Sequence, residues 1–443
     1  MDETDLPSPL SPRAATTENS AVARLVAFAA MLVIYGLAYF QRTGIPGTIF
    51  DELQHDFGLS ASAVTALGAV FIYVYAGMQL VVGVAADHYG GRRTLLFGSA
   101  IMCVGAVLFP GAQTTPMLFL SRVLIGFGSS FVYLSIVKEV DTLFAAHRFA
   151  GLLGLAMLAS YAGNIVATLP FERAVHGFGW RPALFAVAIA SLAVLGVAWV
   201  VLRRLRPVPG RRNGVSLGLL WDVLRNRRSR PLLFCGMVNF PIVFVIQGIL
   251  GKKFMQDVVG LSSAEAALFV LVMASVCGVA AVLAGPALRM TGQRRKPVMV
   301  GAAGLVLLST VLMLLAVLAS APGWVYLAGY VLLALSTIGS PANAATMKEL
   351  NRPDAVAVTI AVLNTAVYVA VGVLGNVAGA ILDSFGSQAQ VGDGRIMYPS
   401  AAYATLFACL AGPALASLLV ALFLVPETHG RPVTLEEIER EVA

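Results

Sequence analysis

Twelve long runs of apolar residues constrain what this 443-residue chain can fold into. A helix that crosses a bilayer needs about 20 predominantly apolar residues, and the runs have about that length. Only 12% of the residues are charged, against about 25% in soluble domains, so the chain lacks the polar groups to cover a water-soluble surface. The runs are continuous and lack the alternation of barrel strands, which predicts an all-α membrane protein with twelve transmembrane helices. The predicted spans are 22–45, 61–86, 94–112, 115–137, 149–171, 182–202, 231–251, 264–288, 297–320, 322–347, 355–382 and 400–425.

Basic residues predict the orientation of these spans. If the N-terminus is cytoplasmic, the external segments hold five of the 30 Lys and Arg residues, and two more lie inside spans, which leaves 23 in cytoplasmic segments. Cytoplasmic loops of membrane proteins carry such an excess, so both termini are expected in the cytoplasm of a multi-pass plasma membrane protein, in bacteria the inner membrane. The five external residues are Arg173, Arg181, Lys252, Lys253 and Arg395, and we expect the two lysines at the external rim.

An internal repeat divides the chain into two halves. The segment Gly83–Arg93 after the second span recurs, at an offset of 202 residues, as Gly285–Arg295 after the eighth span. Duplicated six-span halves are typical of secondary transporters, which bind their solute between the halves. The predicted organisation starts with a disordered cytoplasmic N-terminus (1–21) and a first six-helix bundle (22–202). A cytoplasmic linker with nine arginines, which also touches anionic lipid, follows at 203–230, and then come a second six-helix bundle (231–425) and a cytoplasmic tail (426–443).

The pattern GxxxDxxGxRR at Gly83–Arg93 resembles the signature of the major facilitator superfamily. The sequence PETHGR after the last span is similar to the PETKGR ending of many members. The resemblance implies two pseudo-symmetric six-helix bundles. It also implies a gate in which an aspartate pairs with basic groups and with the positive N-terminal end of span eleven. The gating candidates are Gly83, Asp87, Gly90, Arg92 and Arg93, with the glycines permitting close helix contact and a tight turn. Alternatively, these charged residues only anchor a short loop.

Arg42 is the clearest ionisable residue inside a span, where such a residue is a functional hypothesis by default. Tyr35, Tyr39 and Arg42 are spaced i, i+4, i+7 and share one helix face. A guanidinium suits bidentate capture of carboxylate or phosphate. The stretch resembles the first span of organophosphate–phosphate antiporters and organic-anion transporters, in which an arginine at this depth binds the substrate anion. The alternative is an arginine that snorkels to the external interface.

Other polar residues inside spans complete the predicted site. In span seven the antiporters carry a second arginine, whereas this chain has the neutral Gln247. In span four the family links an arginine to proton coupling, and Arg122 is either that residue or a structural bridge to a neighbouring helix. The candidates for substrate binding are Tyr35, Tyr39, Arg42, Arg122, Tyr133, Asn239, Gln247, Asn343, Asn364 and Tyr368.

These features predict a secondary active transporter of a small organic anion, a carboxylate, driven by proton symport or anion exchange. Proton-coupled efflux of hydrophobic drugs or metabolites is the alternative, and a non-transporting receptor on the same fold is a third. The sequence has no GxxxxGK[ST] loop and no cluster of metal-ligand type, so we expect no ATP, cofactor, metal, nucleic acid or enzymatic activity. The expected partners are the solute, protons and membrane lipid, and the expected state is a monomer.

The orientation predicts that positions 215 and 390 lie on opposite sides of the membrane. Single-cysteine variants Val215→Cys and Gln390→Cys should react with a membrane-impermeant maleimide from the cytoplasmic and the external side respectively. Labelling of both variants from one side would contradict the predicted topology.

Overall fold

The structure is a computed structural model and describes residues 21–144, 146–203, 217–292, 294–352, 356–392 and 395–430. Within these ranges, twelve helices are long and apolar enough to cross a membrane. The first half of the chain contains α2 (Ala21–Thr43), α3 (Phe50–Phe57), α4 (Ala61–Tyr89), α5 (Gly91–Leu108), α6 (Thr115–Leu143), α7 (Ala146–Val166), α8 (Leu169–Phe178) and α9 (Trp180–Arg203). The second half contains α10 (Leu217–Arg225), α11 (Arg230–Val245), α12 (Gly251–Phe254), α13 (Ser263–Met290), α14 (Lys296–Leu318), α15 (Gly323–Leu335), α16 (Gly339–Glu349), α17 (Val356–Ser384), β1 (Gln390–Gly392), β2 (Arg395–Met397) and α18 (Ser400–Phe423). Short 3-10 turns occupy Gly47–Ile49, Ser336–Ile338 and Gly386–Gln388, and π-helical segments Ile246–Leu250 and Met255–Val259 extend α11 through α12.

The predicted spans are confirmed as helices, but two of them are broken where proline removes a backbone donor. Span five is interrupted between α7 and α8, where Pro170 cannot donate to the carbonyl of Val166. Span ten is interrupted by the 3-10 turn before α16, where Pro341 cannot donate to Thr337. The predicted linker 203–230 contains one further helix, α10, and its residues 204–216 lie outside the described part of the chain, as do the N-terminus 1–20 and the end of the tail at 431–443.

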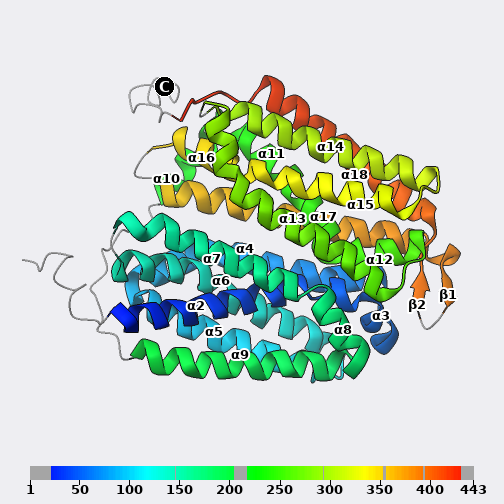
Figure 1. Cartoon of the computed structure of the whole chain (residues 1–443), viewed down its shortest axis with the longest axis horizontal. Helices are drawn as coiled ribbons and strands as arrows, with labels where there is room; N and C mark the ends of the chain where they lie inside the picture. Colours follow the sequence, from blue (N-terminus) through cyan, green and yellow to red (C-terminus); the bar gives the residue numbers. More distant parts are fainter. Residues whose placement is uncertain are drawn as a thin grey trace, which may run out of the picture.

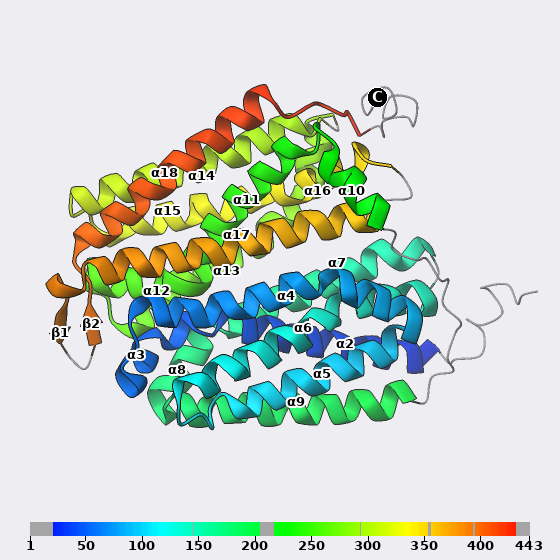
Figure 2. The ribbon, with the colours of Figure 1, turned by 180° about the vertical axis from the view of Figure 1, so that it is seen from behind.

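The helices form two bundles, α2–α9 and α11–α18, which lie one above the other in Figure 1. We call the end of the molecule where α2 begins and α18 finishes the terminal face. The opposite end carries α3 and the antiparallel β1–β2 pair, and we call it the hairpin face (Figure 1). Helices α4 and α17 run side by side along the boundary between the bundles (Figure 2), and α7 packs against α13 on the other side of it.

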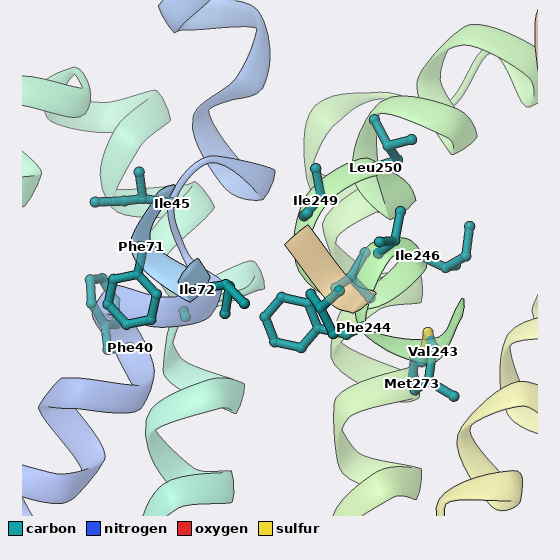
Figure 3. Close-up of a cluster of buried hydrophobic side chains, with 14 of the residues drawn as sticks. Phe40, Ile45, Phe71, Ile72, Val243, Phe244, Ile246, Ile249, Leu250 and Met273 are labelled. Atoms are coloured by element: carbon teal, nitrogen blue, oxygen red, sulfur yellow. The ribbon is translucent and has the colours of Figure 1, made fainter. Parts of the chain in front are cut away.

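Apolar side chains fill the boundary between the bundles at its centre. Figure 3 shows Ile72 of the first bundle next to Phe244 of the second, with Phe40 and Phe71 farther inside the first bundle and Ile249 near Phe244, all at most 7% exposed. Because this cluster is contributed by both halves, the bundles are held together by burial of apolar surface as well as by the polar contacts described below.

Local signals fix the helix ends around the bundles. Ser262 and Glu265 form a capping box at the start of α13, each side chain accepting a hydrogen bond from the other's backbone N–H. Gly90 separates α4 from α5 with φ at +82°, a conformation that favours glycine, so its role in the predicted tight turn is confirmed. Gly83 has open space around it, since a Cβ there would meet nothing within 4 Å. The predicted close helix contact at Gly83 is therefore wrong for this conformation of the chain.

Gly36 and Gly163 allow α2 and α7 of the first bundle to pack closely. A Cβ on Gly163 of α7 would collide with the backbone carbonyl oxygen of Gly36 on α2, and neither backbone can yield without moving its helix. Helices α2 and α7 therefore form one closely packed unit, as small residues allow in membrane proteins.

We predict that Gly163→Ala destabilises the protein by about 1–3 kcal/mol, because the added methyl group forces α2 and α7 apart. Thermal unfolding of the detergent-purified protein should show a lower midpoint for this variant. Gly154→Ala is the matched control on the same helix, because its Cβ would meet nothing within 4 Å. An unchanged midpoint for Gly163→Ala would contradict the close contact.

Candidate functional site

Arg42 lies in the last turn of α2 and is only 4% exposed. Its guanidinium carbon lies 4.5 Å from the ring centroid of Tyr368, 5.0 Å from that of Phe244, 5.2 Å from that of Tyr39 and 5.5 Å from that of Tyr75. We call these four rings the aromatic cage. Because α2 and α4 belong to the first bundle whereas α11 and α17 belong to the second, the cage closes around the guanidinium from both halves.

Further rings extend the cage along α2, α6 and α11. Tyr35 packs edge-on against Tyr39, with ring centroids 5.1 Å apart, and stacks on Tyr133, with centroids 5.5 Å apart. Phe240 contacts Tyr368 within the second bundle, with centroids 6.0 Å apart. The site is therefore a cation in an aromatic environment.

The positive charge of Arg42 is not neutralised by any carboxylate in the described part of the chain. Its Nη1 donates one long hydrogen bond of 3.3 Å to the hydroxyl of Tyr368, and its buried Nε has no partner among the described residues. Cation–π contacts stabilise a desolvated guanidinium by about 2 kcal/mol or more, whereas a charge within a membrane costs at least several kcal/mol. Arg42 therefore retains capacity to bind an anion.

Arg122 does not take part in this cage, contrary to its inclusion among the substrate-binding candidates. It is fully buried, and its guanidinium donates to three backbone carbonyls: those of Gln41 at 2.8 Å, Leu67 at 3.0 Å and Ile45 at 3.1 Å. These carbonyls lie where α2 ends and in the first half of α4. The geometry matches the structural bridge, the second of the two roles considered for Arg122, and it fixes the chain on both sides of Arg42.

The remaining candidates divide into two groups. Asn343 donates to the carbonyl of Leu232, and Asn239 accepts from Ser417, so both connect helices within the second bundle. Asn364 is half-buried one turn from Tyr368 on the same face of α17. Gln247 lines a small cavity of about 10 Å³ beside the cage, together with Thr43, Gly47, Thr48, Asn164, Thr168, Lys252, Ala267 and Val270.

Sequence reasoning missed Tyr75 and Phe244, two rings of the cage, and Phe240, which contacts Tyr368. Each lies in an apolar run with other aromatic residues, and the spacing along one helix does not tell which face of that helix meets Arg42. Only the packing of α4 and α11 against α2 and α17 brings these rings to the guanidinium.

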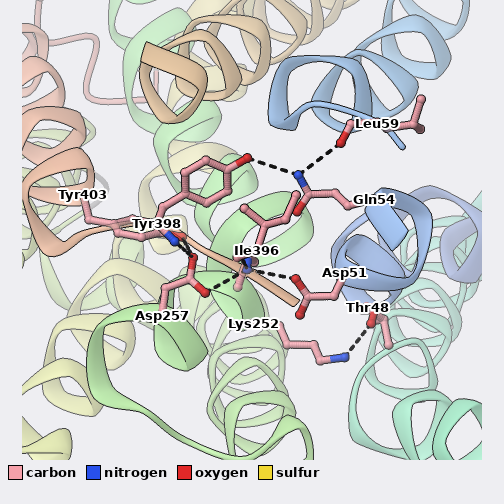
Figure 4. A network of polar contacts seen from close by, with 10 residues as sticks. Thr48, Asp51, Gln54, Leu59, Lys252, Asp257, Ile396, Tyr398 and Tyr403 are labelled. Atoms are coloured by element: carbon pink, nitrogen blue, oxygen red, sulfur yellow. Dashed lines mark hydrogen bonds and ion pairs between the residues drawn. The ribbon is translucent and has the colours of Figure 1, made fainter. Parts of the chain in front are cut away.

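Ion pairs join the two bundles at the hairpin face, between the cage and that end of the molecule. Lys253 is 1% exposed, and its Nζ lies 2.9 Å from Asp51 Oδ1 and 2.8 Å from Asp257 Oδ1 (Figure 4). Asp257 also accepts hydrogen bonds from the Tyr403 hydroxyl at 2.7 Å and from the Tyr398 N–H at 3.1 Å. Since Asp51 belongs to the first bundle and the other residues to the second, this network connects the two halves.

Two further hydrogen bonds cross the boundary at the same face. Lys252 Nζ donates to the Thr48 carbonyl at 2.7 Å, and Gln54 Nε2 donates to the Tyr398 hydroxyl at 3.1 Å (Figure 4). Lys252 and Lys253 therefore lie at the hairpin face but are buried there, and the expectation that this is the external rim stays a prediction. Both are buried inside the helical continuation of α11, because each ammonium finds acceptors there.

A carboxylate at the end of α17 binds the start of α4. Asp383 Oδ1 accepts from the Ala61 N–H at 2.8 Å, and Oδ2 accepts from the Ser62 N–H at 3.0 Å and from the Ser62 hydroxyl. The first N–H groups of a helix have no partner within it and carry the positive end of its dipole, so an anion is favoured there. Asp383 therefore joins the second bundle to the first at the hairpin face.

At the terminal face a glutamate of each half contacts an arginine of the repeated segment, in two different ways. Glu139 on α6 accepts from the backbone N–H of Arg92 at 2.6 Å, whereas Glu349 on α16 forms an ion pair with the guanidinium of Arg295 at 2.9 Å. Arg92 Nη1 also donates to the Leu202 carbonyl at 3.0 Å, whereas Arg93 is exposed. The side chain of Asp87 and residues 353–355 before α17 lie outside the described part of the chain, so the predicted gate between them stays a prediction.

The sequence PETHGR after α18 is anchored at the same face. Glu427 accepts from the N–H groups of Arg295 at 2.9 Å and Lys296 at 3.1 Å, at the start of α14. Partial burial would raise the pKa of Glu427, but these N–H groups and that of His429 hold it below its usual value. The carboxylate therefore stays ionised and caps α14.

Comparison with known proteins places the chain in a family. The model of the Major Facilitator Superfamily matches residues 31–375. The chain belongs to the major facilitator superfamily. Its members share the arrangement described above, and the family is one of transporters rather than of enzymes. A crystal structure of a superfamily member, the peptide transporter POT in complex with sulfate, matches 94% of this chain and 98% of its own with a TM-score of 0.73 at 12% identity, which shows the fold alone.

The relatives that match this chain differ in the solutes that their names give. The agnestins efflux protein of Paecilomyces divaricatus is 26% identical over 193 residues, 43% of this chain and 44% of that protein. Monocarboxylate transporter 11 of Homo sapiens is 25% identical over 199 residues, 44% of this chain and 42% of that protein. The matches thus span less than half the length of these relatives. Others are named as sugar carriers and as hexuronate and sulfoacetate transporters.

We predict that Asp383→Asn shifts the protein toward a state that is open at the hairpin face. The amide keeps one acceptor but loses the negative charge that interacts favourably with the start of α4. The closed state should lose about 1–3 kcal/mol of stabilisation, which raises the population of the open state at least severalfold. Spin labels at His55→Cys and Gln390→Cys, in a background with Cys409→Ser, report the distance between the bundles by pulsed electron resonance. The long-distance population should rise.

The matched control is Asp56→Asn on the same face. Asp56 accepts from Trp180 Nε1 at 2.8 Å within the first bundle and makes no described contact with the second. Asp56→Asn should leave the distance distribution as in the parent. Equal distributions for Asp383→Asn and its parent would show that this carboxylate does not hold the hairpin face closed.

Proposed function

We propose that this chain is a secondary active transporter that moves a small organic anion, a carboxylate, by alternating access. The observation that carries the proposal is Arg42, a buried guanidinium between the two bundles with an unused Nε and no carboxylate partner among the described residues. A charge in surroundings of low dielectric constant attracts an anion more strongly than it would in water. A guanidinium also binds a carboxylate through two parallel hydrogen bonds.

The position of the cage supports alternating access. Tyr39 and Tyr75 belong to the first bundle and Phe244 and Tyr368 to the second, so a solute on Arg42 is contacted by both. We take the moving units to be 22–202 and 231–425, connected by the linker 203–230. With the chain in the plasma membrane and its terminal face toward the cytoplasm, the contacts of Lys253 and Asp383 close the external side in the observed state.

The opposite, external-open state needs a closed terminal face. We assign that closure to Asp87 together with Gly83, Gly90, Arg92 and Arg93, with the N-terminal end of α17 as the partner of the carboxylate. Proton symport or exchange for a second anion drives the transport. We propose that the protein works as a monomer surrounded by lipid.

Export of hydrophobic drugs or metabolites is the second candidate function. Seven aromatic rings in and around the cage favour it, as does the similarity to the agnestins efflux protein. The unneutralised charge of Arg42 argues against it, because a neutral or cationic drug would leave the guanidinium without an anion. The name of monocarboxylate transporter 11 agrees with the first candidate.

Substitution of Arg42 tests the charge of the solute. Arg42→Gln should nearly abolish uptake into proteoliposomes, because no other cation in the cage replaces the guanidinium. Arg42→Lys should reduce uptake by about tenfold or more, since an ammonium keeps the charge but loses the paired donors. The solute is first chosen by a thermal-stabilisation screen against acids, amines, sugars and peptides.

Arg203→Gln is the matched control for these variants. Arg203 also contacts an aromatic ring, with its guanidinium 4.5 Å from the centroid of Trp199, but it lies at the end of α9, away from the cage. Uptake by this variant should equal that of the parent. If the screen yields a cation, or if Arg42→Gln keeps the parent's apparent affinity, drug-type transport replaces the anion proposal.

A further inference from the structure

A small polar pocket lies one helical turn from the aromatic cage toward the hairpin face. Its volume of about 10 Å³ is close to the minimum that one water molecule needs. The polar side chains around it come from both bundles: Thr43, Thr48, Asn164 and Thr168 from the first, Gln247 and Lys252 from the second. We call it the distal pocket.

The distal pocket continues the cage along three helices. Thr43 follows the cage residue Tyr39 by four positions on α2, and Gln247 follows Phe244 by three positions. Four helical residues correspond to a rise of about 6 Å. Asn164 reaches the same level from α7, next to the contact between Gly163 and Gly36. A solute that binds Arg42 among the rings can therefore place its far end in the distal pocket.

Two amide atoms at this pocket have no partner among the described residues. They are Asn164 Oδ1, in a side chain that is 5% exposed, and Gln247 Nε2. A buried polar group without a hydrogen bond is unfavourable, so such atoms are either strained or used by a ligand. One hydroxyl can donate to one amide and accept from the other, whichever way the amides are turned.

The charge at the pocket favours a neutral group over a second anion. Lys252 Nζ donates to the Thr48 carbonyl at 2.7 Å, and its charge acts on Glu52 of α3. Burial raises the pKa of Glu52, and the ammonium of Lys252 opposes that rise. The ammonium is thus already hydrogen-bonded and near a carboxyl group, and a space of one oxygen atom is too small for a second carboxylate.

We propose that the solute is a monocarboxylate with a ring-sized apolar body and a hydroxyl or carbonyl oxygen at its far end. The carboxylate binds Arg42, the body lies among the rings of Tyr39, Phe244 and Tyr368, and the distal oxygen binds Asn164 and Gln247. The rise of about 6 Å separates Tyr39, whose ring centroid lies 5.2 Å from the guanidinium, from Thr43 at the pocket, and a six-membered ring spans a similar length between its carboxylate and a distal oxygen. This inference rests on the proposed function, because it takes Arg42 as the site of the carboxylate.

Matched pairs of acids test the proposal. Binding of benzoate and 4-hydroxybenzoate, and of cyclohexanecarboxylate and 4-hydroxycyclohexanecarboxylate, is measured by calorimetry on the purified full-length chain. The hydroxylated member of at least one pair should bind about five- to tenfold more tightly, as one net hydrogen bond allows. Gln247→Leu and Asn164→Leu should each remove this preference while binding of the unsubstituted acid is kept, which also shows that the variants are folded.

Gln79→Leu is the control for Gln247→Leu. Gln79 is 5% exposed on α4 and donates to the Tyr75 carbonyl, one turn from the cage in the opposite direction. This variant should keep the preference for the hydroxyl group.

Three outcomes would overturn the inference. The parent could bind both members of each pair equally, Gln247→Leu and Asn164→Leu could keep the preference, or terephthalate could bind more tightly than 4-hydroxybenzoate, which would assign a second anion to Lys252. In the first two outcomes, loss of benzoate binding in Arg42→Gln still supports the proposed function. Binding that is independent of Arg42 removes the proposed function itself.

Discussion

A full positive charge buried between two apolar bundles is the constraint on which the rest of this structure depends. Arg42 can remain there because four aromatic rings face its guanidinium and because Arg122 fixes the backbone on both sides of it. The rings stabilise the charge without neutralising it. In the proposed function, an anion binds there without breaking an ion pair among the described residues, so no binding energy is lost in breaking one.

The charges at the closed hairpin face are paired, in contrast to Arg42. There, buried charges are paired with opposite charges or with the N–H groups of a helix end: Lys253 lies between Asp51 and Asp257, and Asp383 caps α4. Such contacts can be exchanged for water when the face opens, so they select between states more than they add stability. In the proposed function, the unpaired charge of Arg42 binds the solute and the paired charges at the hairpin face hold a conformation.

The sequence predicted the features that depend on neighbours along the chain. The twelve spans follow from apolar runs, and the common face of Tyr35, Tyr39 and Arg42 follows from helical spacing. It could not predict that Tyr75 and Phe244 meet the same guanidinium, because that depends on how separate helices pack. Hydropathy likewise ended predicted span seven at residue 251, before Lys252. A hydropathy scale does not take account of the acceptors that allow a lysine to be buried.

The contact between Gly36 and Gly163 has a consequence for how selectivity operates through the transport cycle. It packs α2 against α7 with no room for a side chain between them, so Arg42 and Asn164 lie on two closely packed helices of one bundle. In the proposed transport cycle, the two helices move together and present the same spacing to a solute arriving from either side of the membrane. Gln247 belongs to the other bundle and would reach that solute only as the bundles close. Under the proposal, recognition of length is thus independent of conformation, whereas the last hydrogen bond would form only in the occluded state and favour transport over release.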